Sequence, residues 1–115
     1  METYKPFSII VVPFPFTDKK EAKRRPALVL STVEHQEETD HITLVMITSA
    51  KRSKWNSDYE ISQLETTGLD APSIIRQKIF TIDNRLVIKN IGFLTAQDRV
   101  HLLKKVNSHL SLNLT

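Results

Sequence analysis

Residues 13–31 read PFPFTDKKEAKRRPALVLS and join two apolar stretches through a basic segment. The apolar run at residues 9–12 leads into Pro13 and Pro15, which cannot donate to a sheet ladder, so the first strand should stop there or lie at a sheet edge. Lysine and arginine dominate the following residues, up to the apolar stretch 27–31. The pattern predicts two strands joined by a basic loop in one hairpin-like unit.

Arg25 has a special position in this stretch because it immediately precedes Pro26. A residue before proline is pushed into extended geometry, so Arg25 should hold a defined backbone conformation. Its guanidinium offers five donors in a rigid fork and stays charged, which suits bidentate contact with a phosphate or a carboxylate. Charge alone also fits a solvated basic loop with no binding role.

The composition is that of an ordinary soluble domain. The 115 residues fit one domain spanning 1–115, with 40% hydrophobic and 25% charged residues. No stretch approaches the ~20 apolar residues that span a bilayer, and the N-terminus lacks a signal-peptide pattern, so we expect a cytoplasmic protein with no membrane partner. The absence of cysteine excludes a disulfide framework and thiolate chemistry.

Charge is distributed unevenly along the chain, although the formal net charge is only +3. Basic residues cluster at 19–25 and 51–54, whereas acidic residues gather within 34–40. This separation predicts a polarised surface and a polyanionic partner, which is either a nucleic acid or an acidic protein segment.

The hydrophobic pattern predicts a mainly β domain that ends in a helix. Apolar runs bounded by turn residues predict strands at 7–12, 27–31, 42–47, 73–82 and 86–91, a brief strand at 58–61 and a strand break at Gly92. Residues 32–41 have no apolar period and predict a mobile connection. Thr95 precedes a helical period that should pack on the sheet through Val100, Leu103, Val106 and Leu110. The fold class is therefore α+β, mainly antiparallel β, with a curled or barrel-like sheet.

Two polar features fall on these strands. Thr48 and Ser49 close the strand at 42–47, where hydroxyl groups commonly form turns or caps. Arg76 lies within the strand at 73–82 and needs an anionic partner, because a buried unpaired charge is costly. An intramolecular partner for Arg76 would be Asp58 or Asp83.

Trp55, the one tryptophan in the chain, lies in the polar segment 51–58 beside a basic cluster. Its ring either stacks on a nucleobase or packs against its own loop.

The sequence carries no metal or cofactor signature. The four histidines are scattered, without the spacing of a metal site, at His35, His41, His101 and His109. With only two glycines, Gly68 and Gly92, neither a phosphate-binding loop nor a dinucleotide fingerprint can be drawn. We therefore expect no metal and no cofactor.

Five segments in order resemble the MazF/PemK family of toxins, over roughly residues 7–112: VPFPFTD, RRPALVLS, MITS, GLDAPSIIRQKIFTID and IGFL. The resemblance implies a small curled barrel of the CcdB/PemK, Src-homology-like type with a C-terminal helix. It also implies a homodimeric, growth-inhibiting toxin of a type II toxin-antitoxin system. Such a toxin is a sequence-selective, metal-independent endoribonuclease for single-stranded RNA, restrained by an acidic antitoxin.

The same resemblance implies which residues form the site. Arg25, Thr48 and Ser49 correspond to the catalytic arginine and strand-closing hydroxyls of the family. Cleavage would use the RNA 2′-hydroxyl as nucleophile, so the protein need only stabilise charge and manage protons. We expect RNA binding by Asp18, Lys19, Lys20, Lys23, Arg24, Lys51, Arg52, Trp55 and Arg76, with Arg76 joining Arg25 on the scissile phosphate.

One departure from the family pattern keeps two other functions open. The family usually opens its first strand with Gly-Asp, whereas this chain has Phe7-Ser8 at that place. The loss of the aspartate fits an RNA-binding or antitoxin-binding module without cleavage. A non-catalytic protein that blocks a target such as gyrase, as the CcdB group does with the same fold, is the other alternative.

Overall fold

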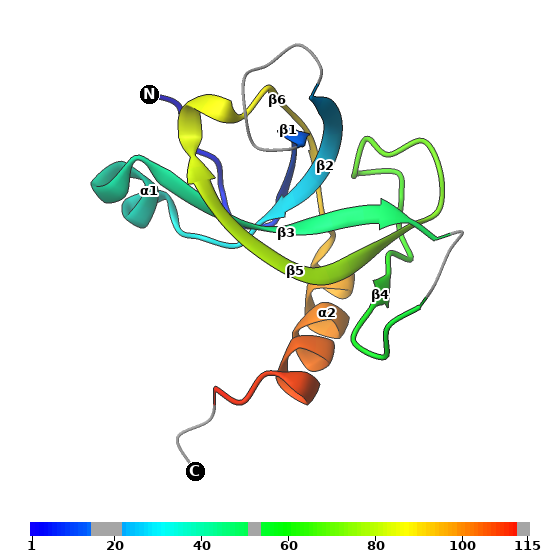
Figure 1. The fold of residues 1–115 in the computed structure, drawn as a ribbon. Coiled ribbons are helices and arrows are strands. Elements are labelled where there is room, and N and C mark those ends of the chain that lie inside the picture. The colour runs from blue at the N-terminus through cyan, green and yellow to red at the C-terminus, as the bar shows by residue number, and fades with distance from the viewer. Residues whose placement is uncertain (15–21, 51–53, 113–115) are drawn as a thin grey trace.

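The computed structural model describes residues 1–14, 22–50 and 54–112 and shows a curled antiparallel sheet with two α-helices (Figure 1). Within the described residues the sheet has six strands in the order β4-β5-β3-β2-β1-β6. The elements are β1 (Ser8–Phe14), β2 (Lys23–Val29), α1 (Val33–Thr39), β3 (His41–Ser49), β4 (Tyr59–Glu60), β5 (Ser73–Asp83), the 3-10 helix η1 (Asn84–Leu86), β6 (Lys89–Phe93) and α2 (Ala96–His109). The predicted fold class is confirmed.

The central strands are buried on both faces, which explains their continuous apolar runs. One face packs against α2. The buried residues of this core are Ile9, Leu28, Val45, Ile47, Ile61, Ile75 and Leu94, together with Leu102 of α2. The opposite face packs through Ile10, Val12, Ala27, Val29, Ile42, Leu44, Met46 and Ile82. Figure 1 shows α2 lying below the sheet and α1 beside the end where β3 begins.

Pro13 and Pro26 lie inside strands at positions where the strand has a single neighbour in the described ladders. β6 pairs with β1 over Ser8–Val11, so Pro13 has β2 beside it but not β6. β3 pairs with β2 over Ala27–Val29, so Pro26 has β1 beside it but not β3. The prediction of an edge position for Pro13 is confirmed, and Pro15 lies outside the described residues.

The second strand begins earlier than predicted. Residues 23–25, assigned above to the basic loop, belong to β2 because Lys23, Arg24 and Arg25 pair with Phe14, Pro13 and Val12. The sheet register overrides the local basic composition here. The extended geometry expected for Arg25 is confirmed.

Residues 32–40 form helix α1 and its two caps, so the prediction of a mobile connection over residues 32–41 was wrong. The Thr32 side chain accepts a hydrogen bond from the His35 backbone N–H at 3.1 Å, and Asp40 ends α1 in the left-handed conformation with φ 58°. The residue that anchors α1 is Gln36, which is fully buried. Its side chain bonds both backbone groups of Tyr4, at 2.9 and 2.7 Å. A polar anchor leaves no apolar period for sequence reasoning to detect.

The last strand is also shifted from its predicted place. The strand predicted over 86–91 is β6 at Lys89–Phe93, and Leu86 instead ends η1, whose start is capped by the Asp83 side chain accepting the Arg85 N–H at 2.8 Å. Gly92 lies within β6 and does not break it. A Cβ at Gly92 would stand 2.3 Å from the Thr66 carbonyl oxygen, so this glycine permits another backbone segment to cross β6.

Helix α2 begins as predicted, but its buried face differs. Thr95 is the N-cap and accepts the Asp98 N–H at 3.2 Å. Val100 and Leu103, expected to pack on the sheet, are 53% and 49% exposed, whereas Leu102 is buried. The helix is rotated because Asp98 is itself buried and bonded to β4 and the segment after it.

Candidate functional site

The strand register brings Arg25, Thr48 and Arg76 to one face of the sheet. Ala27 on β2 pairs with Met46 on β3, and Met46 pairs with Arg76 on β5, so these side chains share a face. Arg25 and Thr48 lie two residues further along their strands and therefore point to the same side. All three line a single pocket of about 260 Å³.

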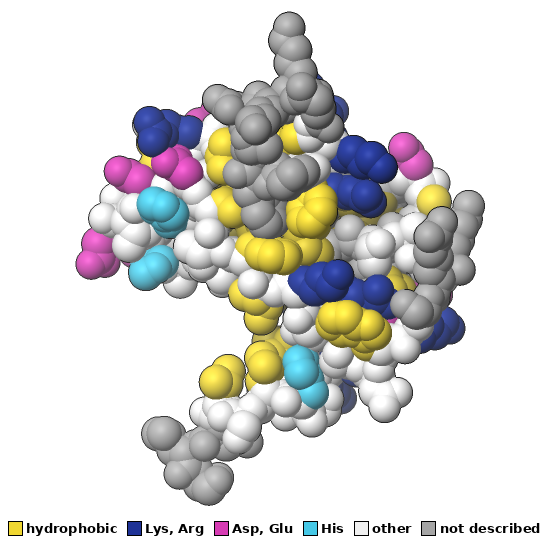
Figure 2. All heavy atoms as spheres, viewed as in Figure 1, with side chains coloured by type: hydrophobic (Ala, Val, Ile, Leu, Met, Phe, Trp, Pro, Cys, Tyr) yellow, Lys and Arg dark blue, Asp and Glu magenta, His cyan; other side chains and the backbone are white. Residues whose placement is uncertain are grey.

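The same pocket has walls that sequence analysis did not assign to the site. They are Phe14, Met46, Ile47, Lys78 and Phe80. Two residues of β5, Gln77 and Lys78, have no opposite partner because the register shifts between Val45 and Met46. Side chains alternate along a strand, so the sequence of β5 places Lys78 and Phe80 on the same face as Arg76. This spacing is the signal from which they could have been assigned to the site. Figure 2 shows Lys and Arg side chains gathered beside a central hydrophobic patch, with acidic side chains on the left over α1.

Strand alternation separates residues that were predicted to act together. Thr48 and Ser49 are successive residues of β3, so Thr48 faces the pocket while Ser49 points to the other side and is exposed. Arg24 precedes Arg25 in β2 and likewise points away from it. The structure thus brings Arg25, Thr48 and Arg76 together without Ser49 or Arg24. Lys23 stands opposite Phe14, on the pocket's face of the sheet.

Five residues expected to bind RNA lie outside the described residues: Asp18, Lys19, Lys20, Lys51 and Arg52. Their predicted roles remain predictions.

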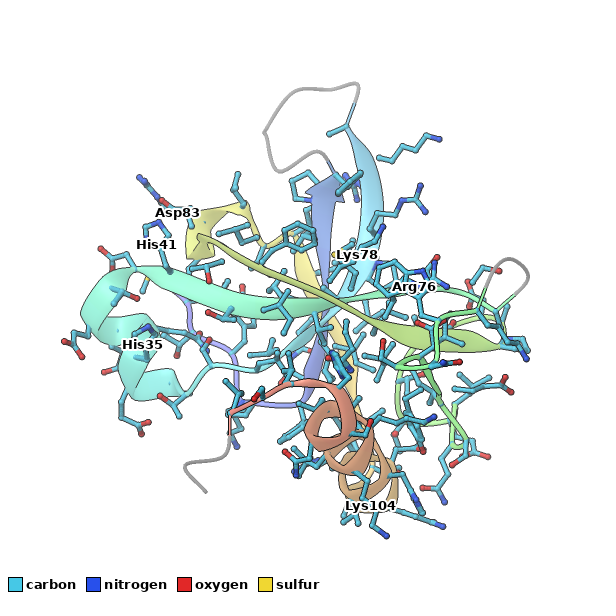
Figure 3. All side chains as sticks on the ribbon, turned by 60° about the horizontal axis from the view of Figure 1, so that its bottom comes forward. His35, His41, Arg76, Lys78, Asp83 and Lys104 are labelled. Carbon is cyan, nitrogen blue, oxygen red and sulfur yellow. The ribbon has the colours of Figure 1, made fainter. Side chains whose placement is uncertain are left out.

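Arg76 has an intramolecular anionic partner, and of the two carboxylates named above it is Asp58 and not Asp83. Its Nε and Nη2 donate to Oδ1 and Oδ2 of Asp58 at 3.1 and 2.8 Å. The Arg76 hydrogen bonds lower the pKa of the Asp58 carboxyl against the opposing effect of burial, and Asp58 in turn raises the pKa of Arg76. The Trp55 ring lies against this pair, with the Arg76 Cζ 4.7 Å from a ring centroid. Figure 3 shows Arg76 and Lys78 close together on β5.

A second polar cluster fixes α2 to the segment that carries Trp55 and Asp58. Asp98 is fully buried and accepts hydrogen bonds from the Tyr59 hydroxyl, from Ser62 N at 3.1 Å and Oγ at 2.8 Å, and from Gln63 N at 3.0 Å. Burial opposes ionisation of Asp98, but these bonds together lower its pKa. Burial and the neighbouring Asp98 raise the pKa of Tyr59 to about 12.

Phe7-Ser8, which stands where the family usually has Gly-Asp, has an unusual backbone conformation. Phe7 has φ 68°, the left-handed region that favours glycine. The Arg99 guanidinium lies over its ring, 4.9 Å from the centroid. The backbone form that glycine favours is therefore present here with a phenylalanine side chain, and Ser8 is buried.

The described ranges contain no group of three or more His, Cys, Asp or Glu side chains placed to hold a metal ion. No helix among the described residues has the length and apolarity needed to cross a bilayer.

Solved structures similar in fold to this chain include MazF toxins. The Mycobacterium tuberculosis toxin MazF-mt6 superposes with a TM-score of 0.71 at 21% identity, covering 92% of this chain and 98% of that one. The MazE-MazF structure (Form-III) from Deinococcus radiodurans gives 0.74 at 20% identity, covering 97% and 100%. An endoribonuclease in complex with its cognate antitoxin from Mycobacterial species gives 0.74 at 12% identity, covering 98% and 100%.

The family is established by sequence. Residues 5–110 match the model of the PemK-like, MazF-like toxins of type II toxin-antitoxin systems, and the chain belongs to this family. No curated protein matches the sequence.

Proposed function

We propose that this chain is the toxin of a type II toxin-antitoxin pair and a sequence-selective, metal-independent endoribonuclease for single-stranded RNA in the cytoplasm. The observation that supports this function is the shared pocket of Arg25 and Thr48, walled by Phe14, Lys78 and Phe80. A fixed positive charge, a hydroxyl and aromatic rings suit a phosphate flanked by bases. Cleavage of the mRNA would stop growth until the antitoxin binds.

The reaction uses only the RNA, water and these side chains. The RNA 2′-oxygen attacks the adjacent phosphorus and forms the O2′–P bond, while its proton passes to water. The P–O5′ bond breaks and the 5′-oxygen takes up a proton from water, so the products are a 2′,3′-cyclic phosphate and a 5′-hydroxyl. Arg25 stabilises the charge on the phosphate and donates a hydrogen bond toward the departing 5′-oxygen. A guanidinium pKa above ~12 makes Arg25 a poor base, so its role is charge stabilisation and donation.

Thr48 and the remaining cations complete the proposed site. The Thr48 hydroxyl donates to a non-bridging phosphate oxygen from the same face as Arg25. Lys23 and Lys78 hold neighbouring phosphates, which makes binding strongly salt-dependent.

Incubation of the purified protein with mixed-sequence RNA under a chelator tests this proposal. We expect discrete cuts whose fragments carry cyclic-phosphate and 5′-hydroxyl ends. Arg25→Ala should abolish cutting without unfolding, whereas Arg24→Ala, which removes the same charge from the opposite face, should retain most of it. Intact RNA would refute the proposed activity, and normal cutting by Arg25→Ala would refute the mechanism.

A module that binds RNA or antitoxin without cleaving is the second candidate, favoured by Phe7-Ser8 in place of Gly-Asp. The left-handed φ at Phe7 shows that the backbone suits a glycine at this position, so the chemical difference is the missing aspartate. Saturable binding of RNA with no cut product in the same assay would support this candidate over the toxin.

We also propose an acidic antitoxin and a homodimer as partners. An acidic antitoxin segment would compete with RNA for the cations of the pocket. A groove between α2 and β5 suits a second copy, because Ile79 and Leu103 line it and are 45% and 49% exposed. Light scattering should show a dimer that Leu103→Lys weakens, with Ile88→Lys as the control on another exposed apolar residue. A wild-type monomer at micromolar concentration would contradict the dimer.

A further inference from the structure

Trp55 is held beside the pocket by a backbone hydrogen bond and two cation–π contacts, while much of its surface faces solvent. It is the one tryptophan of the chain and is 44% exposed. Two cations that line the pocket also lie over its ring: the Arg76 Cζ at 4.7 Å and the Lys78 Nζ at 5.6 Å from ring centroids. The indole therefore borders the site in which Arg25 and Thr48 meet.

Asp58 clamps the backbone of Trp55 and the guanidinium of Arg76 at the same time. Its Oδ2 accepts the Trp55 backbone N–H at 2.8 Å and the Arg76 Nη2 at 2.8 Å, while Oδ1 accepts the Arg76 Nε at 3.1 Å. The Asp58 N–H returns a bond to the Trp55 carbonyl at 3.0 Å, and the Asp58 side chain is only 6% exposed. One carboxylate thus fixes the turn that presents the indole.

The ion pair changes what Arg76 can contribute. A bidentate pair with a carboxylate has no net charge and already uses one donor face of the guanidinium. Arg76 is therefore a weaker phosphate ligand than the exposed Arg25, and its guanidinium contacts Asp58 and the indole.

We propose that Trp55 is a stacking platform for a nucleobase next to the scissile phosphate, and that Arg76 and Asp58 are positioning residues that hold the indole in place. This inference rests on the proposed function in placing the phosphate at Arg25. A ring fixed before binding loses little freedom when a base stacks on it, and stacking accepts any base because every base has a π-face. The substrate class is a single-stranded oligonucleotide with at least one unpaired base beside the cleaved bond.

The sign of the Asp58→Asn effect distinguishes positioning from charge. If charge alone bound the RNA, this variant would bind more tightly, because it removes a negative charge and releases Arg76. Positioning predicts weaker base-dependent binding, because the clamp on Trp55 and Arg76 is weakened. Arg76→Lys keeps the charge but loses the planar fork, so it should share the defect.

The chain contains a matched control for the clamp. Arg85 and Asp83 form a bidentate pair with the same two distances, 3.1 and 2.8 Å, but Arg85 is 82% exposed at its side chain and lies at η1. Asp83→Asn and Arg85→Lys make the same chemical changes away from the pocket and should leave binding unchanged.

The test uses short 2′-O-methyl oligonucleotides of adenine, cytosine or uracil, which lack the nucleophile, and an abasic strand with the same backbone. Binding is followed by anisotropy of a label on the strand, and stacking by the fluorescence of Trp55, which has no other tryptophan to obscure it. We expect base-bearing strands to quench Trp55 and the bound abasic strand not to. Trp55→Ala should lower the affinity for base-bearing strands by roughly tenfold or more, and Trp55→Phe should retain most of this affinity.

The outcomes separate this inference from the proposed function. Base-dependent quenching without RNA cleavage would support the platform and refute the nuclease. Cleavage with equal quenching by abasic and base-bearing strands, or a Trp55→Ala variant with unchanged affinity, would overturn the platform alone. Tighter binding by Asp58→Asn, with native circular dichroism, would overturn the positioning role.

Discussion

Arg25 on β2 and Thr48 on β3 point to the same face of the sheet and line one pocket, although their strands pair only as far as Ala27 and Met46. Each residue lies two positions beyond the last pair of the β2–β3 ladder. Their side chains are therefore next to the paired region but outside it. This relationship places a guanidinium and a hydroxyl in one small pocket whose other walls are largely apolar.

Removing the Thr48 hydroxyl should impair cleavage without disturbing the strand. Thr48→Val keeps the branched shape, and the loss of a hydrogen bond to a developing phosphate charge should lower kcat/KM by about 10²-fold. Ser49→Ala removes a hydroxyl from the opposite face and should have little effect. Kinetics on a fluorogenic RNA substrate would measure both, and equal losses would contradict the assignment of Thr48.

Gly92 is required by a close backbone approach. A Cβ there would meet the Thr66 oxygen at 2.3 Å and the Thr67 carbonyl carbon and oxygen at 2.6 and 2.7 Å. Gly92→Ala should therefore lower the free energy of unfolding by at least ~2 kcal/mol, because backbone must move. Denaturant unfolding would measure this loss. Lys89→Ala, at an exposed position of the same strand, should change stability by less than about 0.5 kcal/mol.

At residue 7, glycine should give a more stable protein than alanine, which reverses their usual order of stability. At φ 68° an alanine is strained and a glycine is not, so Phe7→Gly should be more stable than Phe7→Ala by about 1 kcal/mol. Both variants lose the ring, so the difference reports the backbone. The same two substitutions at Lys89 should rank in the ordinary order. Thermal unfolding of the four variants decides, and a more stable alanine at residue 7 would contradict the left-handed conformation.

Asp98 should make the fold sensitive to acid. Its pKa is lowered in the folded state, so its stabilising effect is present above the ordinary carboxyl pKa of 3.8 and is lost as the pH falls below that value. Asp98→Asn should cost about 1–3 kcal/mol at neutral pH, because an amide cannot accept all the bonds. Below pH 3.8 the free energy of unfolding should fall less steeply with decreasing pH in Asp98→Asn than in the wild type. Asp70→Asn, at an exposed position, is the control and should leave the free energy of unfolding at neutral pH nearly unchanged.

Tyr59 should have the opposite effect in alkali. Its folded pKa is about 12 against an ordinary 10.0, so its contribution is complete below pH 10 and is lost as the pH rises from 10 toward 12. Tyr59→Phe should be less stable than wild type at neutral pH and lose less stability in this alkaline range. Unfolding curves and the tyrosinate absorbance would show it, and an unchanged alkaline limb would count against the Tyr59–Asp98 bond.

The sequence determined the strands and the start of α2 through local signals. The runs at residues 7–12, 27–31 and 42–47 are mostly apolar because both faces of their strands are buried, and such runs can be recognised from the sequence alone. Thr95, followed by the helical apolar period, identified the helix N-terminus. Helix α1 was missed because its buried anchor is the polar Gln36, whose partners lie in distant segments.

The candidate site could be predicted only in part. The sequence by itself indicated Arg25 through the adjacent proline and placed Arg76 on a strand with Asp58 as a possible partner. Only the tertiary structure decided that Thr48 faces Arg25 while Ser49 does not, and that Arg76 is clamped beside Trp55. The physical reason is that a residue's own neighbours fix its extended geometry, whereas strand register and long-range pairing fix which face it shares and with whom.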